Sequence, residues 1–379
     1  MKATVVGIGK LGLGFAMLLE EKGHHVCGVD INQSYVDSLN QKQYTTKEPH
    51  LEEMVKRSKN FHATTNLKEG LDFSDLIFII VQTPNSGGDK FYDHTILSNL
   101  LLKINQHKVE NKDLIIGCTV MPKYIDQIGV GLISDCKNSH LSYNPEFVAQ
   151  GDIVEGFRRP DIILLGTNHE ELKPKIKDLY TSTVDKEVKW AFMKPLDAEI
   201  VKITLNGYVT TKLSFANMIS DVCDTVGGDK HVVLDAVGGD SRIGNKYFRP
   251  GNSFGGPCFP RDTKALLMFV EQSRVNGNLL KATTEYNEEH ILFQVKMLLD
   301  QGLDEYVIRD VCFKENSKVP IIEESAKLKI AKCLYESGKK VIIEDEIGLI
   351  NEVKKEFGNI FEYRILPGRV MVSGSPNFP

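Results

Sequence analysis

Three closely spaced glycines near the start of the chain, Gly7, Gly9 and Gly12, constrain its fold more than any other feature. They follow a short apolar run typical of a buried strand, residues 3–6, and precede an amphipathic helical pattern over residues 11–21. In a strand–turn–helix unit the first glycine permits the tight turn, the second lets the backbone approach a pyrophosphate, and the third lets helix and strand pack closely. The pattern predicts a dinucleotide-binding turn, and a turn with three unrelated glycines is the simpler alternative.

The end of the second predicted strand indicates which dinucleotide is bound. Residues 25–30 form this strand, which closes on Asp30, eighteen residues after Gly12. A carboxylate there accepts a hydrogen bond from the ribose 2′-hydroxyl and repels a 2′-phosphate, so the sequence predicts NAD rather than NADP. The expected cofactor contacts in this region are Gly7, Ile8, Gly9, Lys10, Leu11, Gly12 and Asp30.

Strand-like and helical patterns alternate along the first half of the chain. Further β-branched, apolar runs lie at residues 76–81, 114–119, 140–143, 161–166 and 188–192. Such runs, separated by helices, are typical of a parallel doubly wound sheet. We therefore predict an α/β protein with a Rossmann-like NAD-binding domain over residues 1–194. Thr83 and Thr119 follow two of these strands, where open sheets bind ligands, although either hydroxyl could simply cap a helix.

In the second half of the chain the alternation of strand and helix patterns gives way to a long helical pattern. Residues 196–226 place apolar or small side chains every three to four positions without proline, which predicts one long helix. We expect a central helical domain, residues 195–298, that forms a homodimer through this helix. The strand–helix alternation resumes after residue 306, predicting a shortened Rossmann-like α/β domain over residues 299–379. Residues 367–379 are expected to be poorly ordered.

Charge, apolar runs and cysteines exclude several classes of protein. The net charge of −5 argues against binding nucleic acid or an anionic membrane surface. No apolar run approaches the ~20 residues that span a bilayer, and no secretory signal is visible, so a cytoplasmic protein is expected. The seven cysteines are scattered and the ten histidines form no local ligand pair, which predicts neither disulfides nor a metal.

Two segments contain candidate catalytic groups. Lys202 and Asn206 lie one turn apart on the predicted long helix, where a cation and an amide could stabilise an oxyanion, or could form an ordinary solvated face. A Gly-Gly-Pro turn delivers Cys258 just before a helix start, where the helix dipole favours a thiolate. Asp262 follows one turn later and could act as a base or order a water. The alternative for Cys258 is a small buried core residue.

Together these motifs resemble the nucleotide-sugar 6-dehydrogenases, the family of UDP-glucose, UDP-N-acetylhexosamine and GDP-mannose dehydrogenases. The resemblance covers about residues 1–290, and the matching stretches are 7–12, 81–84, 118–120, 144–147, 199–206, 240–244 and 255–262. It implies that a C6 alcohol is oxidised to a carboxylate with two NAD+, and that the shortened domain over residues 299–379 binds the nucleotide sugar. UDP-glucose is favoured as substrate, and GDP-mannose and UDP-N-acetylhexosamines are the alternatives.

The resemblance also implies residue roles. Cys258 matches the nucleophile that forms a thiohemiacetal and then a thioester, and Lys202 and Asn206 match the oxyanion-stabilising pair. The other implied catalytic groups are Asp262 (base chemistry and water), Thr119 (water positioning) and Glu146 (thioester hydrolysis). Implied cofactor contacts beyond the glycine turn are Thr83, Thr119 and Arg261. Implied substrate contacts are Glu146, Phe147, Lys202, Asn206, Arg242, Phe254 and Gly255, with Arg242 reaching across a dimer interface.

Three positions depart from the family pattern. Gln150 stands where a second glutamate is common, and Arg261 where a lysine is usual. Glu323 stands where the family has a nucleotide-contacting arginine, which questions closure of the site by the last domain. Two other functions therefore remain open: a two-electron β-hydroxyacid dehydrogenase, which has no use for Cys258, and an inactive nucleotide-sugar sensor.

Overall fold

The computed structural model describes residues 1–148, 150–314 and 319–366 of the chain. The chain divides into two compact units, Met1–Leu205 and Asn206–Pro379, which are considered separately below. The predicted division into three parts (1–194, 195–298 and 299–379) stays a prediction. The predicted disordered tail, residues 367–379, lies outside the described residues.

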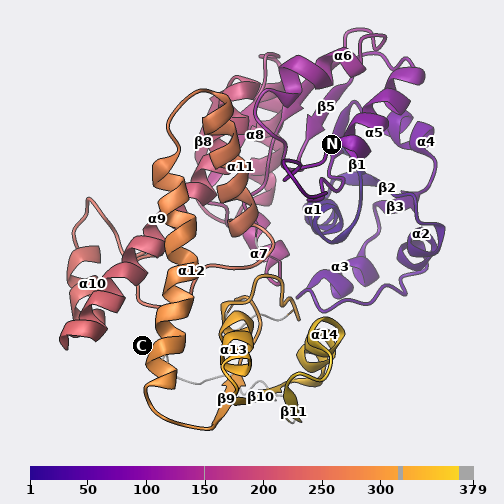
Figure 1. Ribbon diagram of the computed structural model, residues 1–379. Helices are drawn as coiled ribbons and strands as arrows, with labels where there is room; N and C mark the ends of the chain where they lie inside the picture. The colour runs from indigo at the N-terminus through magenta and orange to yellow at the C-terminus, as the bar shows by residue number, and fades with distance from the viewer. Residues whose placement is uncertain (149, 315–318, 367–379) are drawn as a thin grey trace. The chain divides into compact units, whose positions relative to one another are not determined.

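The first unit is built on one eight-stranded sheet in the order β3-β2-β1-β4-β5-β6-β7-β8 (Figure 1). Its strands are β1 Lys2–Val6, β2 His25–Val29, β3 Phe61–Thr64, β4 Leu76–Ile79, β5 Asp113–Ile116, β6 His140–Tyr143, β7 Ile162–Gly166 and β8 Lys189–Met193. Neighbouring strands are parallel except β6 and β7, which run antiparallel and share a single register pair, Tyr143 with Gly166. The predicted doubly wound α/β sheet is confirmed, with this one reversed strand junction.

Helices cover both faces of this sheet because each central strand is apolar on both faces. In β4, Phe78 joins one core cluster while Ile77 and Ile79 join the other. The first cluster packs under α1 Lys10–Glu21, α2 Gln33–Asn40, α3 Leu51–Arg57, α7 Ile153–Arg158 and α8 Leu172–Thr183. The second packs under α4 Leu67–Phe73, α5 Thr95–Gln106 and the π-helix η1 Ile125–Gly129, which α6 Val130–Leu132 follows.

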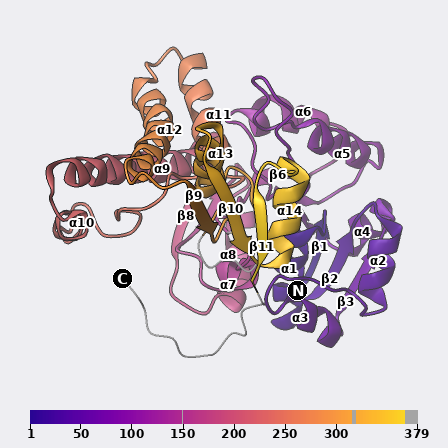
Figure 2. The same cartoon turned by 60° about the horizontal axis from the view of Figure 1, so that its bottom comes forward.

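The predicted long helix is confirmed as α9, Pro195–Val226, a helix of 32 residues through which the division between the units runs. The second unit continues with α10 Lys230–Gly238, α11 Phe259–Gln272 and α12 Asn278–Leu299. Its three-stranded parallel sheet, in the order β11-β10-β9, consists of β9 Glu305–Arg309, β10 Lys340–Asp345 and β11 Glu362–Ile365. Figure 2 shows these strands with α13 Ala326–Glu336 and α14 Ile347–Phe357 beside them.

Across the described part of the chain, no helix combines the length and the apolar character needed to cross a bilayer.

Candidate active site

The glycine turn between β1 and α1 has the geometry expected for a dinucleotide. Gly7 has φ +89°, and a Cβ on it would lie 2.5 Å from the Ile80 carbonyl oxygen. A Cβ on Gly12 would lie 2.0 Å from the Gly7 oxygen, so this glycine permits the close approach of α1 to the turn. A Cβ on Gly9 would meet nothing within 4 Å, which leaves bare backbone beside the α1 N-terminus. A pyrophosphate fits this cradle, because helix N-terminal N–H groups and the dipole favour anions.

Neighbouring side chains complete the cofactor region. The Tyr35 hydroxyl donates to the Ile8 carbonyl oxygen at 2.7 Å and so secures the turn. Asp30 is half-buried just after β2, and one of its oxygens accepts from the Asn32 amide at 3.1 Å. Its other oxygen can still accept from a ribose hydroxyl. Lys10 and Leu11 open α1, Lys10 exposed and Leu11 half-buried.

Thr83 and Thr119 lie together, as their places after adjacent strands predict. The buried Thr83 hydroxyl donates to the Thr119 carbonyl oxygen at 2.9 Å. Both follow the carboxyl ends of neighbouring strands, β4 and β5, and β4 also pairs with β1 at the point where the strand order reverses. Ligands of open α/β sheets bind at this kind of switch point. Thr83 therefore belongs to the same edge of the sheet as the glycine turn.

Lys202 is a buried cation beside the segment that follows β6. Its Nζ donates to the Glu146 carbonyl oxygen at 2.5 Å and lies 4.8 Å from the centre of the Phe147 ring. Its residue surface is 7% exposed, so the alternative of a solvated helix face does not hold for this residue. The Glu146 carboxylate accepts from the Val148 amide at 3.0 Å. The structure thus brings together three predicted site residues of the first unit: Glu146, Phe147 and Lys202.

Glu199, one turn before Lys202, anchors α9 within the first unit rather than facing solvent. It is fully buried, and its carboxylate accepts from the Lys123 amide at 2.6 Å and from the Ile125 amide at 2.8 Å. Burial raises the pKa of Glu199 to about 7, although the two amide bonds oppose that shift. Because the folded state holds the proton more tightly than the unfolded state, Glu199 stabilises the fold below its ordinary pKa, and that contribution is lost as the pH rises towards 7.

This carboxyl predicts a measurable pH dependence. Relative to Glu199→Gln, the wild-type free energy of unfolding should fall by about 2–3 kcal/mol between pH 4.5 and pH 8. Urea unfolding followed by circular dichroism across this range measures the difference. Glu187→Gln, which alters an exposed carboxylate, is the matched control and should run parallel to the wild type. Parallel profiles for wild type and Glu199→Gln would contradict the assignment.

In the second unit, Cys258 occupies the position immediately before α11. All seven cysteines fall within the described residues, and Cys258 is the exposed one, so the alternative of a buried core thiol is wrong. Pro260 stands in the first turn of the helix, and the Asp262 amide donates to the Cys258 carbonyl oxygen at 2.8 Å. The dipole of a helix favours an anion at this end, so the position suits a thiolate.

Asn206 and Asp262 also meet within the second unit. The Asn206 side-chain amide donates to Asp262 Oδ2 at 2.5 Å, and Asp262 is 1% exposed. The bond fixes the carboxylate one turn after Cys258.

Residues that the sequence analysis missed hold the loop before Cys258. Asn287 on α12 forms two hydrogen bonds with the backbone of Phe254. Its Oδ1 accepts from the Phe254 amide at 2.8 Å, and its Nδ2 donates to the Phe254 carbonyl oxygen at 3.0 Å. The buried His290, one turn later, lies 2.9 Å from the Gly251 oxygen through Nε2 and 2.9 Å from Asp221 through Nδ1. These contacts join residues 33 to 69 positions apart, so no local sequence pattern indicated them.

Gly255 and Gly256, which precede Cys258 by two to three residues, contact the segment that precedes α13. A Cβ on Gly255 would lie 2.0 Å from the Glu324 oxygen, and one on Gly256 would lie 2.3 Å from the Phe313 ring. The Gly256 amide donates to the Glu323 oxygen at 3.0 Å. This bond uses the backbone of Glu323, so the glutamate found there does not prevent this segment from packing on the glycines.

Two predicted site arginines belong to the second unit. Arg242 is exposed and forms a two-bond pair with Asp240, Nε to Oδ1 at 2.9 Å and Nη2 to Oδ2 at 2.7 Å. Arg261 lies in the first turn of α11 and is half-buried.

Comparison with known proteins identifies the class. Residues 1–184 match the NAD binding domain of the UDP-glucose/GDP-mannose dehydrogenase family, and residues 196–289 match its central domain. The chain belongs to this family and is an NAD-dependent nucleotide-sugar 6-dehydrogenase, an oxidoreductase. The predicted family, enzyme class and cofactor are thereby confirmed.

Individual relatives differ in the substrate that they are named for. The chain is 28% identical over 360 residues to a UDP-glucose 6-dehydrogenase of Rickettsia felis, covering 93% of this chain and 80% of the relative. It is 26% identical over 375 residues to the GDP-mannose 6-dehydrogenase of Pseudomonas aeruginosa, covering 94% and 84%. A solved UDP-glucose dehydrogenase structure from Pyrobaculum islandicum is similar with a TM-score of 0.86 at 27% identity, covering 96% of this chain and 85% of that one.

Proposed function

We propose that the protein oxidises the C6 alcohol of UDP-glucose to the carboxylate in two hydride transfers, with covalent capture of the intermediate by Cys258. The observation that carries the proposal is the exposed Cys258 at the N-terminus of α11, one turn before Asp262. A thiol in that position is a competent nucleophile. NAD, when bound at the glycine turn, accepts the hydride in each oxidation.

The reaction sequence follows from the need to retain a reactive aldehyde. The alcohol first loses a hydride and a proton to become an aldehyde. The Cys258 thiolate then adds to the aldehyde carbon, giving a thiohemiacetal whose loss of a second hydride and proton leaves a thioester. Water adds to the thioester and loses one proton, the C–S bond breaks to release the Cys258 thiolate, and the carboxylic acid loses the second proton and leaves as the carboxylate. Capture keeps the carbon in place between the two oxidations.

Each remaining residue has a proposed role. Lys202 has three N–H donors, so it can hold the Glu146 oxygen and still donate to an oxyanion. Asn206 is proposed as the second donor, and Asp262 as the group that accepts protons and holds the water. Thr119 and Glu146 are proposed to position that water and assist hydrolysis. Substrate contacts are proposed for Phe147, Arg242, Phe254 and Gly255, and a cofactor contact for Arg261.

Sequence features favour UDP-glucose over other nucleotide sugars. Residues 240–244 and 258–264 resemble the UDP-glucose branch, and relatives named UDP-glucose 6-dehydrogenase match most of the chain. Residues 246–251 and 253–256 resemble the GDP-mannose branch, which makes that nucleotide sugar the main competitor.

A substrate panel tests this choice. UDP-glucose, GDP-mannose and UDP-N-acetylmannosamine are each incubated with enzyme and NAD, and NADH formation is followed by absorbance. UDP-glucose should give the highest kcat/KM by at least about tenfold, the discrimination that a fitted pocket supplies. NADH formation with GDP-mannose or the N-acetyl sugar but not with UDP-glucose would overturn the substrate assignment and leave the family intact.

We also propose a homodimer formed through the central helix. Tyr208, Phe215 and Val222 recur every seven residues on α9, so they share one face of the helix, and they are 68%, 50% and 51% exposed. A second copy of this face would cover them. The proposed location is the cytoplasm, because none of the seven cysteines, all of which are among the described residues, forms a disulfide, as expected in a reducing compartment.

A further inference from the structure

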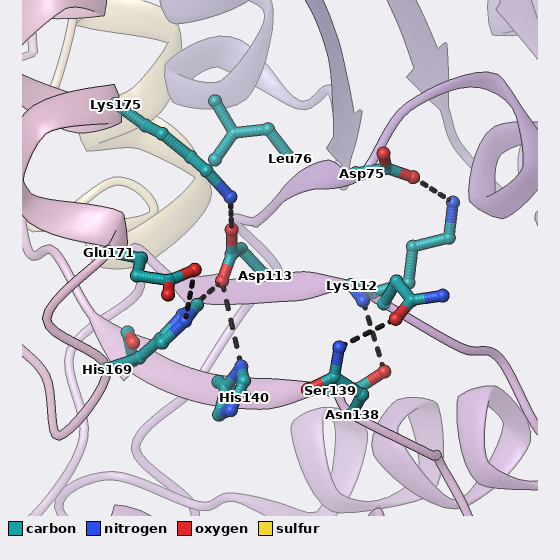
Figure 3. Close-up of polar contacts among 12 residues, drawn as sticks. Asp75, Leu76, Lys112, Asp113, Asn138, Ser139, His140, His169, Glu171 and Lys175 are labelled. Carbon is teal, nitrogen blue, oxygen red and sulfur yellow. Dashed lines mark hydrogen bonds and ion pairs between the residues drawn. The ribbon is translucent and has the colours of Figure 1, made fainter.

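Three ligand-type side chains converge at the opposite edge of the eight-stranded sheet from the glycine turn. Asp113 and His140 are the first residues of the parallel strands β5 and β6 and pair directly in register. His169 lies three residues after β7, whose last residue, Gly166, pairs antiparallel with Tyr143, the last residue of β6. The chain beyond β7 therefore runs back toward His140 at the start of β6. Figure 3 shows the three side chains pointing toward one another from these elements. They lie outside the proposed active site, which uses the carboxyl ends of β1, β4 and β5.

Their donor atoms are close enough for one ion. His169 Nδ1 lies 2.9 Å from Asp113 Oδ1, and His140 Nδ1 lies 4.0 Å from the same oxygen. The donor atoms all lie within 4.8 Å of one another, and the two imidazoles are stacked with centroids 3.7 Å apart. Ligands about 2.0–2.1 Å from a tetrahedral ion stand roughly 3.4 Å from each other, so modest side-chain rotation suffices.

The surroundings support coordination in two further ways. Glu171 Oε2 lies 3.7 Å from His169 Nε2, on the far side of the ring, where a carboxylate commonly orients a metal-bound histidine. Lys175 Nζ pairs with Asp113 Oδ2 at 2.8 Å, which turns Oδ1 toward the histidines. The Asp113 side chain is 5% exposed while that of His140 is 38% exposed, so one side of the group is open to water ligands.

We propose that Asp113, His140 and His169 form a binding site for a divalent transition-metal ion of the zinc class, with water completing the coordination. Two imidazole nitrogens and one carboxylate oxygen are a ligand set that suits such ions. No metal was predicted from the sequence, because no two histidines and no two cysteines stand at the short spacing of a local ligand pair. These ligands are 27 and 29 residues apart, and only the sheet brings them together.

The ion would stabilise the sheet between β6 and β7, the neighbouring strands with the fewest register pairs. β6 and β7 share one register pair, whereas β5 and β6 share four and β7 and β8 share five. Side chains supplement the junction: the Ser142 and Thr167 hydroxyls lie 2.7 Å apart, and Asn144 Nδ2 donates to the Leu164 oxygen at 2.7 Å. An ion held by β5, β6 and the segment after β7 would tie both sides of this junction together.

Cobalt titration of the full-length protein tests the site. Chelator-treated wild type should bind one Co2+ per chain with visible d–d absorption and without the near-ultraviolet band of a sulfur ligand. Zn2+ should displace the Co2+ and raise the Tm. His140→Ala and His169→Ala should each weaken binding by at least about 100-fold and remove the Zn2+-dependent rise in Tm.

The matched control is His62→Ala, which removes a half-exposed histidine from β3 of the same unit and should leave Co2+ binding unchanged. His140 is partly exposed, so its alanine variant should fold, and circular dichroism checks this. Binding that persists in both His140→Ala and His169→Ala, a sulfur-ligand band, or no saturable binding to wild type would overturn the proposal. In the last case the three residues form only a hydrogen-bonded network.

Discussion

Cys258→Ala is expected to lower the rate of carboxylate formation by at least about 10^3-fold and to leave at most one NADH per sugar consumed. Without the thiolate no thiohemiacetal forms, so the second hydride has no covalently held carbon from which to leave. The exposed position of Cys258 before α11 means that the shorter side chain removes little packing. Progress curves of NADH absorbance and chromatographic separation of the sugar products measure the effect.

The control for this variant is Cys333→Ala, which removes a half-buried thiol from α13 in the same unit. It should retain near wild-type kcat. If Cys258→Ala still produced the carboxylate at a comparable rate, the capture mechanism would be wrong. NADH production at the same rate in wild type and Cys258→Ala, without any carboxylate, would instead favour a two-electron alcohol oxidation, the β-hydroxyacid dehydrogenase alternative.

Lys202→Met should lower kcat by about 10^2–10^3-fold while leaving the affinity for NAD nearly unchanged. Methionine approximates the length and volume of lysine but cannot donate to an oxyanion. The buried setting of Lys202, against the Glu146 oxygen and the Phe147 ring, makes its charge more effective than an exposed one. Steady-state kinetics with the nucleotide sugar, and NAD binding followed by fluorescence, separate the two effects.

Lys194→Met serves as the control because Lys194 is exposed and directly precedes α9. The Tm of Lys202→Met must be recorded, since the variant leaves the Glu146 oxygen without this donor. Lys202→Arg should recover only part of the rate, because it keeps the charge with a different geometry. A folded Lys202→Met with wild-type kcat would remove Lys202 from the chemistry.

Most of the fold was predictable because local patterns and tertiary structure agree. The glycine turn, the apolar strands and α9 all carry strong periodic or steric signals, and each forms where expected. The reversed junction between β6 and β7 was not predictable, because a strand buried on both faces looks the same in either direction. β3 was also missed, since Phe61–Thr64 is a four-residue strand at the sheet edge with only alternate residues buried.

The candidate site was predictable only where its residues are close in sequence. Cys258 and Asp262 lie within one helix turn, so their spacing revealed them. The burial of other site residues could not be predicted from the sequence. Glu199 and Lys202 share a helix face whose charged residues would be expected in water, and the structure buries both. The hydrogen bonds between Asn287 and the Phe254 backbone join residues 33 positions apart, and no local sequence pattern indicates such a contact.

The most direct test of the central claim is the ratio of NADH formed to nucleotide sugar consumed at completion. Limiting UDP-glucose is incubated with wild-type enzyme and excess NAD, and NADH and the sugar products are quantified in the same sample. Covalent capture at Cys258 predicts two NADH and one carboxylate per sugar, with no aldehyde released. One NADH per sugar, with an aldehyde as the product, would contradict the account.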